Sequence, residues 1–423
     1  MFDRPESGER AILVHLTLRA GQEDLYELKE LAKSAGAVPA HVVTGTRQRP
    51  DPKFFVGKGK LEEIKSEISI HEADLVLVNH ALTPSQERNL EEALGVRVVD
   101  RNGLILDIFA LRAQTFEGKL QVELAQLKHL STRLIRGWTH LDRQKGGGIG
   151  MRGPGETQLE TDRRLVSNRI KLIQRRLEKV AKQRSQGRGK RKKSETPSVS
   201  LVGYTNAGKS TLFNTLTGAN IYVADQLFAT LDPTLRSCSL DNGADIILAD
   251  TVGFIRHLPH ELIAAFRSTL QEASEADLLL HIIDANAEDR EDTMFQVNQV
   301  LADIDASEIP QLEVFNKIDL LDNVEPHIDL DDMGKPVRVW MSAVTGAGTS
   351  LLFQALAELF SNTKVKRKCY LQSHQGGVRA NLFNYARIID EKGTDLGGWD
   401  LSIEIDKKHL GLLKDIKVEK MGL

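Results

Sequence analysis

Residues 199–218, VSLVGYTNAGKSTLFNTLTG, carry the spacing G-x-x-x-x-G-K-S between Gly203 and Ser210. The motif follows an apolar, strand-like run and opens a helix-like run, which is the context that a phosphate-binding loop requires. Glycines let backbone N–H groups curve around phosphate oxygens, and the N-terminus of the helix adds positive potential. The pattern predicts that Lys209 reaches the β- and γ-phosphates of a nucleotide and that Ser210 binds Mg²⁺.

A second stretch, IILADTVGF, supplies groups for the same phosphates. It ends a predicted strand at Asp250, which places a carboxylate near the metal. Gly253 follows three residues later and can offer its backbone N–H to the γ-phosphate. The stretch therefore predicts the metal-facing and phosphate-sensing part of the site.

Two later stretches predict the choice of base. LEVFNKID ends a strand with Asn316, Lys317 and Asp319. A carboxylate at this place accepts two hydrogen bonds from guanine N1–H and the N2 amine, and adenine has no such pair of donors. VWMSAVTG then offers the backbone of Ser342 and Ala343 to guanine O6. GTP is the predicted substrate.

These four stretches, in this order, resemble the translation-factor-like P-loop GTPases over residues 198–362. The resemblance implies a threonine that completes the Mg²⁺ shell, for which LFATLDPTLR offers Thr230 and Thr234; we favour Thr230, in a segment that folds over the nucleotide. The predicted catalytic residues are Lys209, Thr230 and Gly253, and the predicted metal ligands are Ser210, Thr230 and Asp250. The full set expected at the nucleotide is Gly203, Tyr204, Thr205, Asn206, Ala207, Gly208, Lys209, Ser210, Thr211, Phe228, Ala229, Thr230, Leu231, Asp232, Asp250, Thr251, Val252, Gly253, Asn316, Lys317, Ile318, Asp319, Ser342, Ala343 and Val344.

One position departs from the wider class. Many of its members place a glutamine after D-T-x-G to orient the attacking water, and here that residue is Phe254. A phenyl ring cannot orient water by hydrogen bonding, and it is either a core residue or a part of the site with another role. We therefore expect slow intrinsic hydrolysis, with the water positioned by a potassium ion, another residue or a partner in trans.

Composition limits the class of protein and its surroundings. The chain has 423 residues, 27% of them charged, and a net charge of -3. Cys238 and Cys369 form neither a disulfide framework nor a zinc motif, which fits a reducing cytosol. The first residues are polar and no apolar run approaches a membrane span, so we expect a cytoplasmic protein that is not inserted in a membrane. We also expect a monomer in solution.

Charge is unevenly distributed along the chain. Residues 128–193 contain 20 Lys and Arg against 5 Asp and Glu, whereas the remainder carries 36 against 54. Such a separation indicates that the middle of the chain binds a polyanion. The alternative is a solvated helix surface followed by a disordered linker.

The order of strand-like and helix-like runs predicts a multidomain α/β protein. Residues 1–100 alternate between the two types, which is typical of a small doubly wound domain with a parallel sheet. Alternation resumes in the P-loop GTPase domain, residues 198–362. Residues 363–423 combine strand-like KCYLQS and WDLSIEID with helix-like VRANLFNYARII, and form a predicted small α+β domain.

Residues 101–190 are predicted to form a coiled-coil-like helical hairpin. One apolar stripe includes Leu120 and Leu124, and a second runs at heptad spacing through Ile170, Ile173 and Leu177. The predicted connection, residues 137–155, includes the first part of the glycine-rich GGGIGMRGPGETQLETDRR. Thr157 and Glu160, in the rest of that segment, form a T-x-x-E capping box at the start of the second helix. The following AKQRSQGRGKRKKSETPS is polar and basic, and we interpret it as a linker whose end is residues 191–197.

The chain as a whole resembles the HflX family of ribosome-associated GTPases. FFVGKGK, the glycine-rich segment and FATLDPTLR match signatures of that family over at least residues 40–360. The resemblance implies binding to the large ribosomal subunit and ribosomal RNA, and splitting of stalled or stressed ribosomes. In that interpretation the glycine-rich segment is the tip of the ribosome-contacting arm, and the alternative is a tight turn that only closes the hairpin.

Two other functions remain open. The resemblance also implies ATP hydrolysis and RNA unwinding, for which VGKGK in the first domain is a weak phosphate-loop candidate. That would make the chain an ATPase or GTPase that remodels ribosomal RNA, whereas a role in ribosome biogenesis is a variant of the first, ribosome-acting function. The third function is a signalling GTPase that regulates a membrane protease through a protein partner. The basic middle of the chain argues against a partner that is only protein.

Overall fold

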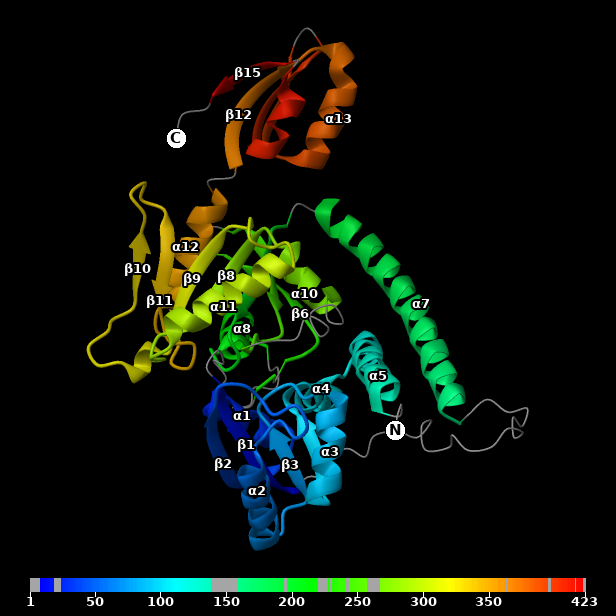
Figure 1. Cartoon of the computed structure of the whole chain (residues 1–423). Helices are drawn as coiled ribbons and strands as arrows, with labels where there is room; N and C mark the ends of the chain where they lie inside the picture. The colour runs from blue at the N-terminus through cyan, green and yellow to red at the C-terminus, as the bar shows by residue number, and fades with distance from the viewer. Residues whose placement is uncertain are drawn as a thin grey trace.

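The computed structural model (Figure 1) contains four structural parts arranged along the chain. The described residues are 8–18, 24–137, 158–193, 196–219, 227–228, 230–240, 243–256, 267–361, 364–394, 397–414 and 416–420.

The N-terminal part is a four-stranded parallel sheet in the order β2-β1-β3-β4. Its strands are β1 (Arg10–Leu18), β2 (Val38–Arg47), β3 (Leu75–Val78) and β4 (Arg97–Asp100). The helices are α1 (Leu25–Ser34), α2 (Lys58–His71), α3 (Pro84–Leu94) and α4 (Arg101–Arg112). Alternate residues of β1 face opposite sides, so Ile12 and Val14 pack in one core with α2 and α3, and Ala11 and Leu13 in another with α1 and α4. The doubly wound fold predicted for this part is confirmed.

Helix α4 corrects the limit of this domain. The sequence predicts that the domain ends at residue 100 and that residues 101–190 form the hairpin. Asp100 instead caps α4 by accepting from Gly103 N at 2.8 Å, and Ile105, Ile108 and Phe109 are buried in the core beneath the sheet. We therefore place α4 in the first domain.

Helices α5 (Phe116–Gly137) and α7 (Gln158–Lys193) form the hairpin. Leu120 and Leu124 pack with Ile173, and an ion pair of 2.6 Å joins Glu123 to Arg169, so the two helices run antiparallel. The predicted linker is wrong over its first part, because α7 continues through it to Lys193. Residues 138–157, which contain the predicted connection after Gly137 and the threonine of the capping box, lie outside the described residues.

The GTPase domain is built on a seven-stranded sheet in the order β10-β11-β9-β8-β5-β7-β6. The strands are β5 (Ser198–Gly203), β6 (Thr234–Ser239), β7 (Asp245–Asp250), β8 (Leu278–Asp284), β9 (Gln311–Asn316), β10 (His327–Leu330) and β11 (Pro336–Trp340). Only the two outer strands of the described sheet run antiparallel to their neighbours. The helices are α8 (Lys209–Thr217), α10 (Arg267–Ser274), α11 (Arg290–Asp303), α12 (Thr349–Ser361) and the 3₁₀ turn η1 (Ile318–Leu320). Carboxyl ends of the parallel strands meet at one edge, where open α/β sheets bind ligands.

The C-terminal domain is an antiparallel sheet in the order β13-β14-β12-β15, around a core that includes Cys369 and Ile403. Its elements are β12 (Lys364–Leu371), η2 (Ser373–Gln375), α13 (Gly376–Tyr385), β13 (Ala386–Gly393), β14 (Trp399–Asp406), η3 (Lys407–Leu413) and β15 (Lys417–Lys420). One detail differs from the sequence prediction, since the helix ends at Tyr385 and the ARII that follows begins β13. The α+β class of this domain and the mixed α/β class of the chain are confirmed.

Candidate functional site: a nucleotide-binding edge joined to the N-terminal domain

The phosphate loop joins β5 to α8, and two of its glycines have backbone conformations that other residues avoid. Gly203 has φ 147° and Gly208 has φ 95°. A Cβ at Gly208 would lie 2.2 Å from Asn316 Nδ2, and one at Gly203 would lie 2.3 Å from the carbonyl oxygen of Ile282. Both positions require glycine because of the backbone conformation and the close packing of the base-binding strand and of β8.

Lys209 lies at the first turn of α8 with its side chain buried inside the loop. Its Nζ donates to the carbonyl oxygen of Tyr204 at 2.6 Å, which holds the amine at the place where the phosphates are expected. Burial lowers the pKa of Lys209 to about 8, and the Asp250 carboxylate opposes that shift. His281 on β8 is also buried, and its pKa is lowered to about 4, mainly by burial and then by the charge of Lys209. The amine is therefore a poorly solvated cation that gains from a phosphate partner.

The three predicted metal ligands converge. Ser210 Oγ donates to Asp250 Oδ2 at 2.8 Å, Thr230 Oγ1 donates to the same oxygen at 3.0 Å, and the two hydroxyls are 2.8 Å apart. Octahedral Mg²⁺ with bonds of about 2.0–2.1 Å places neighbouring ligand oxygens about 2.9 Å apart. Asp250 Oδ1 is buried without a hydrogen-bond partner, and burial raises the pKa of this carboxyl. An all-oxygen set with an unsatisfied buried carboxylate fits a hard divalent cation.

Gly253 and Phe254, which follow β7, contact the phosphate loop at Thr205 and Gly203. A Cβ at Gly253 would lie 2.8 Å from Thr205 Cγ2 and 3.0 Å from Lys209 Nζ, so only glycine leaves this backbone open to the loop. Phe254 N donates to the carbonyl of Gly203 at 3.1 Å, and its own carbonyl accepts from Thr205 N at 2.7 Å. The ring of Phe254 is buried in the core, which is the core-residue alternative left open by the sequence.

The predicted base-binding residues lie together at the end of β9. Asn316 Nδ2 donates to the carbonyl of Ala207 at 2.8 Å, and its Oδ1 accepts from Ala343 N at 2.8 Å, so this amide joins the phosphate loop to the 342–344 segment. Lys317 has φ 67° and pairs with Asp284 at 2.8 Å. Asp319 is exposed in η1, available to a base.

The remaining predicted residues divide into supporting and exposed positions. Thr251 is buried and donates to the carbonyl of Leu201 at 2.6 Å, so its hydroxyl anchors a strand end. Asn206 and Val344 are exposed. Thr211 is half-buried, and the buried ones are Ala207, Val252, Ile318 and Ser342. Ala229 lies outside the described residues.

The segment around Thr230 does not place all of its side chains at the nucleotide. Phe228 and Leu231 are buried in the core that the GTPase domain shares with α1 and α4, and the rings of Phe228 and Phe109 meet edge to face at 4.6 Å. Asp232 accepts from Gln114 N at 2.9 Å and from Thr115 N at 2.8 Å, just ahead of α5. These three side chains have partners away from the phosphate loop, since the apolar pair packs in the core and the carboxylate bonds at the start of α5. Contact of the three residues with the nucleotide stays a prediction.

A buried charged group connects the phosphate loop to the N-terminal domain. The Tyr204 hydroxyl donates to Glu27 of α1, which pairs with Arg101 at 2.6 Å. Arg101 also donates to Asn79 Oδ1 at 2.8 Å and to the carbonyl of Arg256, two residues beyond Phe254, at 3.0 Å. Burial, and then the Glu27 carboxylate, raises the pKa of Tyr204. Sequence reasoning missed Glu27 and Arg101, because on their own helices they look like ordinary charged residues.

A phosphate loop, three converging oxygen ligands and an N-K-x-D segment at adjacent strand ends define a P-loop GTPase. Family models match along the chain: "GTP-binding GTPase N-terminal" at residues 22–110, "GTP-binding GTPase Middle Region" at residues 112–191 and "50S ribosome-binding GTPase" at residues 198–317.

Curated relatives extend over almost the whole chain. GTPase HflX of Escherichia coli (strain K12) is 56% identical over 407 residues, which are 96% of this chain and 95% of that protein. GTPase HflX of Magnetococcus marinus is 41% identical over 430 residues, 100% and 98% of the two chains. A crystal structure of SsGBP with GDP aligns with 84% of this chain and 99% of that one, at 27% identity and TM-score 0.49. The chain belongs to the HflX family of GTPases, and its reaction is the hydrolysis of GTP, as the sequence predicted.

One structural finding bears on the membrane. None of the helices in the described ranges combines the length and the apolar character needed to span a bilayer.

Proposed function

We propose that this chain is a Mg²⁺-dependent GTPase that binds the large ribosomal subunit through ribosomal RNA and splits stalled or stressed ribosomes. The observation that carries the proposal is the direct connection between the nucleotide site and a basic helical arm. Asp232 lies two residues after Thr230 and bonds to the start of α5. The description of the matching GTPase model, "50S ribosome-binding GTPase", supports the same partner. The proposed protein is cytoplasmic, where ribosomes are, and monomeric.

The arm carries the charge expected of an RNA-binding surface. Residues 128–193 have 20 basic against 5 acidic residues. Ile170, Ile173 and Leu177 of α7 pack against α5. The exposed basic side chains of α7 are outside this contact, and they include Arg164, Lys171, Arg175, Arg176, Lys179 and Lys182. Phosphate contacts by such side chains supply salt-dependent affinity for RNA without reading its sequence. In Figure 1, α7 lies along the side of the molecule, with α5 between part of it and the N-terminal domain.

The residues of the site divide the chemistry of hydrolysis. Lys209 and the backbone amides of the phosphate loop bind the β- and γ-phosphates and stabilise the charge that develops on them. Ser210, Thr230 and Asp250 hold Mg²⁺, which, when bound, neutralises phosphate charge. Gly253 offers its N–H to the γ-phosphate, and Asp319 accepts from guanine.

Phe254 leaves the positioning of the attacking water to another group, and in this proposal that group acts on the ribosome. Its buried ring neither donates nor accepts a hydrogen bond, so it orients no water. Basal hydrolysis is therefore slow, and the group that positions the water becomes effective on the ribosome. This links turnover to the place where splitting is needed.

The connection through Asp232 gives a route for the nucleotide state to reach the arm. Asp232 Oδ2 accepts hydrogen bonds from the backbone N–H groups of Gln114 and Thr115. Asp232 Oδ1 accepts from Thr115 Oγ1 at 2.5 Å. Thr115 also caps α5, since its hydroxyl accepts from Gly118 N at 2.9 Å. A movement of Thr230 toward or away from Mg²⁺ therefore shifts the base of α5.

Co-sedimentation with separated ribosomal subunits, in the presence of GDP, a GTP analogue or an ATP analogue, tests the proposal. We expect binding to the large subunit that is strongest with the GTP analogue, and conversion of intact ribosomes into subunits on a sucrose gradient. The triple variant Arg175→Gln, Arg176→Gln, Lys179→Gln should bind more weakly and with a flatter salt dependence, by a slope of up to about 0.7–0.9 per lost phosphate contact.

Lys335→Gln is the control for loss of a basic side chain elsewhere, since Lys335 is exposed in the turn between β10 and β11, at one edge of the GTPase sheet. Equal binding by wild type and the triple variant at every salt concentration removes α7 from the RNA-binding surface. Binding only to the small subunit, or only with the ATP analogue, contradicts the proposed function.

A further inference from the structure

Three metal-binding side chains gather on the N-terminal domain, outside the nucleotide site. His41 comes from β2, and Glu67 and His71 lie one turn apart on α2. Both elements contribute to the core between the sheet and the helices α2 and α3. The GTPase domain packs on the opposite face of the sheet, together with α1 and α4. Among the described residues, this is the only group of three or more such side chains whose ligand atoms come close together.

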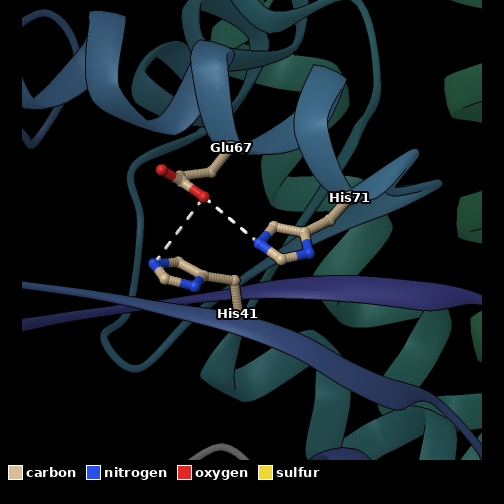
Figure 2. A group of neighbouring side chains, drawn as sticks. All are labelled: His41, Glu67 and His71. Atoms are coloured by element: carbon tan, nitrogen blue, oxygen red, sulfur yellow. Dashed lines mark ion pairs between the residues drawn. The ribbon is translucent and has the colours of Figure 1, made fainter.

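The three ligand atoms face one another. Glu67 Oε2 lies 3.3 Å from His71 Nε2 and 3.8 Å from His41 Nε2, and all three atoms lie within 4.8 Å of one another. Figure 2 shows the Glu67 carboxylate directed toward both imidazoles, with the strand on one side and the helix on the other. The side chains are 42%, 22% and 28% exposed for His41, Glu67 and His71, so an ion from solvent can reach them.

These separations are close to those of a tetrahedral zinc site. With Zn–N and Zn–O bonds of about 2.0–2.2 Å, neighbouring ligand atoms lie about 3.3–3.5 Å apart. The two carboxylate–imidazole separations approach that value, and the imidazoles need to move closer together. The rings are stacked 18° from parallel with centroids 5.1 Å apart. One ring must therefore rotate about its χ2 torsion, which is soft for histidine.

We propose that His41, Glu67 and His71 bind one divalent transition-metal ion of the zinc class, with water as a fourth ligand. Two imidazoles and one carboxylate suit Zn²⁺ and its neighbours, whereas Mg²⁺ and Ca²⁺ prefer oxygen ligands alone. The ion is therefore distinct from the Mg²⁺ proposed for the GTPase site. It links the last turns of α2 to β2, the edge strand of the sheet, whose outer side has no neighbouring strand in the described fold. Such a bond between edge strand and covering helix stabilises the domain when the metal is present.

The test uses the full-length protein without nucleotide or Mg²⁺, titrated with Zn²⁺ in competition with a chromogenic chelator, and with Co²⁺ followed by its visible absorption. We expect one ion per chain, an absorption spectrum typical of tetrahedral Co²⁺, and a rise in melting temperature on adding Zn²⁺. His71→Gln and His41→Gln, each close in shape to histidine, should each weaken Zn²⁺ binding at least about tenfold and abolish the shift in melting temperature.

His374→Gln is the matched control, because His374 is exposed on the C-terminal domain and belongs to no such cluster. Circular dichroism identifies any variant that fails to fold, and two independent variants keep the test decisive. Unchanged Zn²⁺ binding in both folded variants places the ion elsewhere and overturns the proposal. Absence of binding at micromolar Zn²⁺, or a melting temperature that responds to pH but not to Zn²⁺, shows that the group is only a loose ion pair.

Discussion

Asp319 is the side chain on which the choice of base depends. It is exposed in η1, three residues after Asn316, which ends β9 and bonds to Ala207 and Ala343. In Asp319→Asn a donor amide replaces one carboxylate oxygen opposite guanine N1–H. We expect GTP binding to weaken by about 1–3 kcal/mol and xanthosine triphosphate to become a ligand, because a desolvated group is left unpaired.

Fluorescent-nucleotide titration of the full chain measures both affinities. Asp322→Asn, three residues further along and exposed, is the control for a general loss of negative charge. Equal GTP affinity in Asp319→Asn and wild type would show that another group recognises the base.

Lys209 predicts a dependence of nucleotide binding on pH. Burial lowers its pKa to about 8 in the protein without nucleotide. Phosphate oxygens favour the charged amine, so the complex keeps the proton to higher pH than the free protein does. Above pH 8 binding must therefore take up a proton, and affinity falls as pH rises, by up to about tenfold per pH unit.

Calorimetry of GDP binding near pH 7 and near pH 8.5, in two buffers of different ionisation enthalpy, counts the protons exchanged. Lys209→Met supplies the baseline for titration of the nucleotide itself. Proton uptake near pH 8.5 that is the same in wild type and Lys209→Met assigns the linkage to another group.

At the scale of elements, α5 meets the GTPase domain at Gly118. A Cβ at this position would lie 2.2 Å from Asp232 Oδ1, so Gly118→Ala must displace the carboxylate from the start of the helix. The same change favours α5 itself by about 0.5–1 kcal/mol, since alanine is the better helix former. We therefore expect a stable arm that has lost its connection to the Thr230 segment.

The readout for Gly118→Ala is GTP hydrolysis with and without large ribosomal subunits. Stimulation should fall several-fold while basal turnover is kept, and amides at Gln114 and Thr115 should exchange faster with solvent. Gly59→Ala is the matched control, a glycine in α2 whose Cβ would meet nothing within 4 Å. Full stimulation in Gly118→Ala would mean that Asp232 does not transmit the nucleotide state.

The elements also show where sequence reasoning succeeds and where it stops. The strands and helices of the first domain were predicted because short β-branched runs and helical runs alternate between turn residues. The end of α7 was missed, since Lys, Arg, Gln and Ala are strong helix formers even without an apolar stripe, and they outweigh Gly187 and Gly189. The start of β13 was missed because a short apolar run such as ARII fits a helix or a strand equally well.

The phosphate and base motifs were predictable because each is local and lies at a strand end. The contacts of Asp232 were not, because Gln114 and Thr115 are more than a hundred residues away and no spacing connects them. Burial of Glu27 and Arg101 depends likewise on a second domain packing over them. Side chains in local motifs can thus be assigned from sequence, while those that join domains require the structure.

At the scale of the whole molecule, the N-terminal domain and the GTPase domain share one apolar core. That core holds residues of α1 and α4 together with Leu227, Phe228 and Phe254. A buried polar group also joins the two domains: the Glu27 carboxylate accepts a hydrogen bond from the Tyr204 hydroxyl and pairs with Arg101. The segment around Phe228 and the phosphate-loop residue Tyr204 thus both contact the N-terminal domain.

Tyr204→Phe tests this arrangement with little change of shape. The ring and the backbone carbonyl that holds Lys209 remain, whereas Glu27 loses a donor in a site where its carboxylate is only 5% exposed. We expect the free energy of unfolding to fall by about 1–3 kcal/mol, because Glu27 Oε1 then keeps only the long 3.4 Å bond from Arg256 N. Hydrogen exchange should accelerate along α1 and at Phe254, while GDP affinity changes little. Tyr26→Phe is the matched control, since Tyr26 lies on α1 next to Glu27 but is 68% exposed. If Tyr204→Phe and Tyr26→Phe have the same hydrogen-exchange rates and the same free energy of unfolding, the Tyr204 hydroxyl does not stabilise the contact between the two domains. The apolar core alone then holds them together.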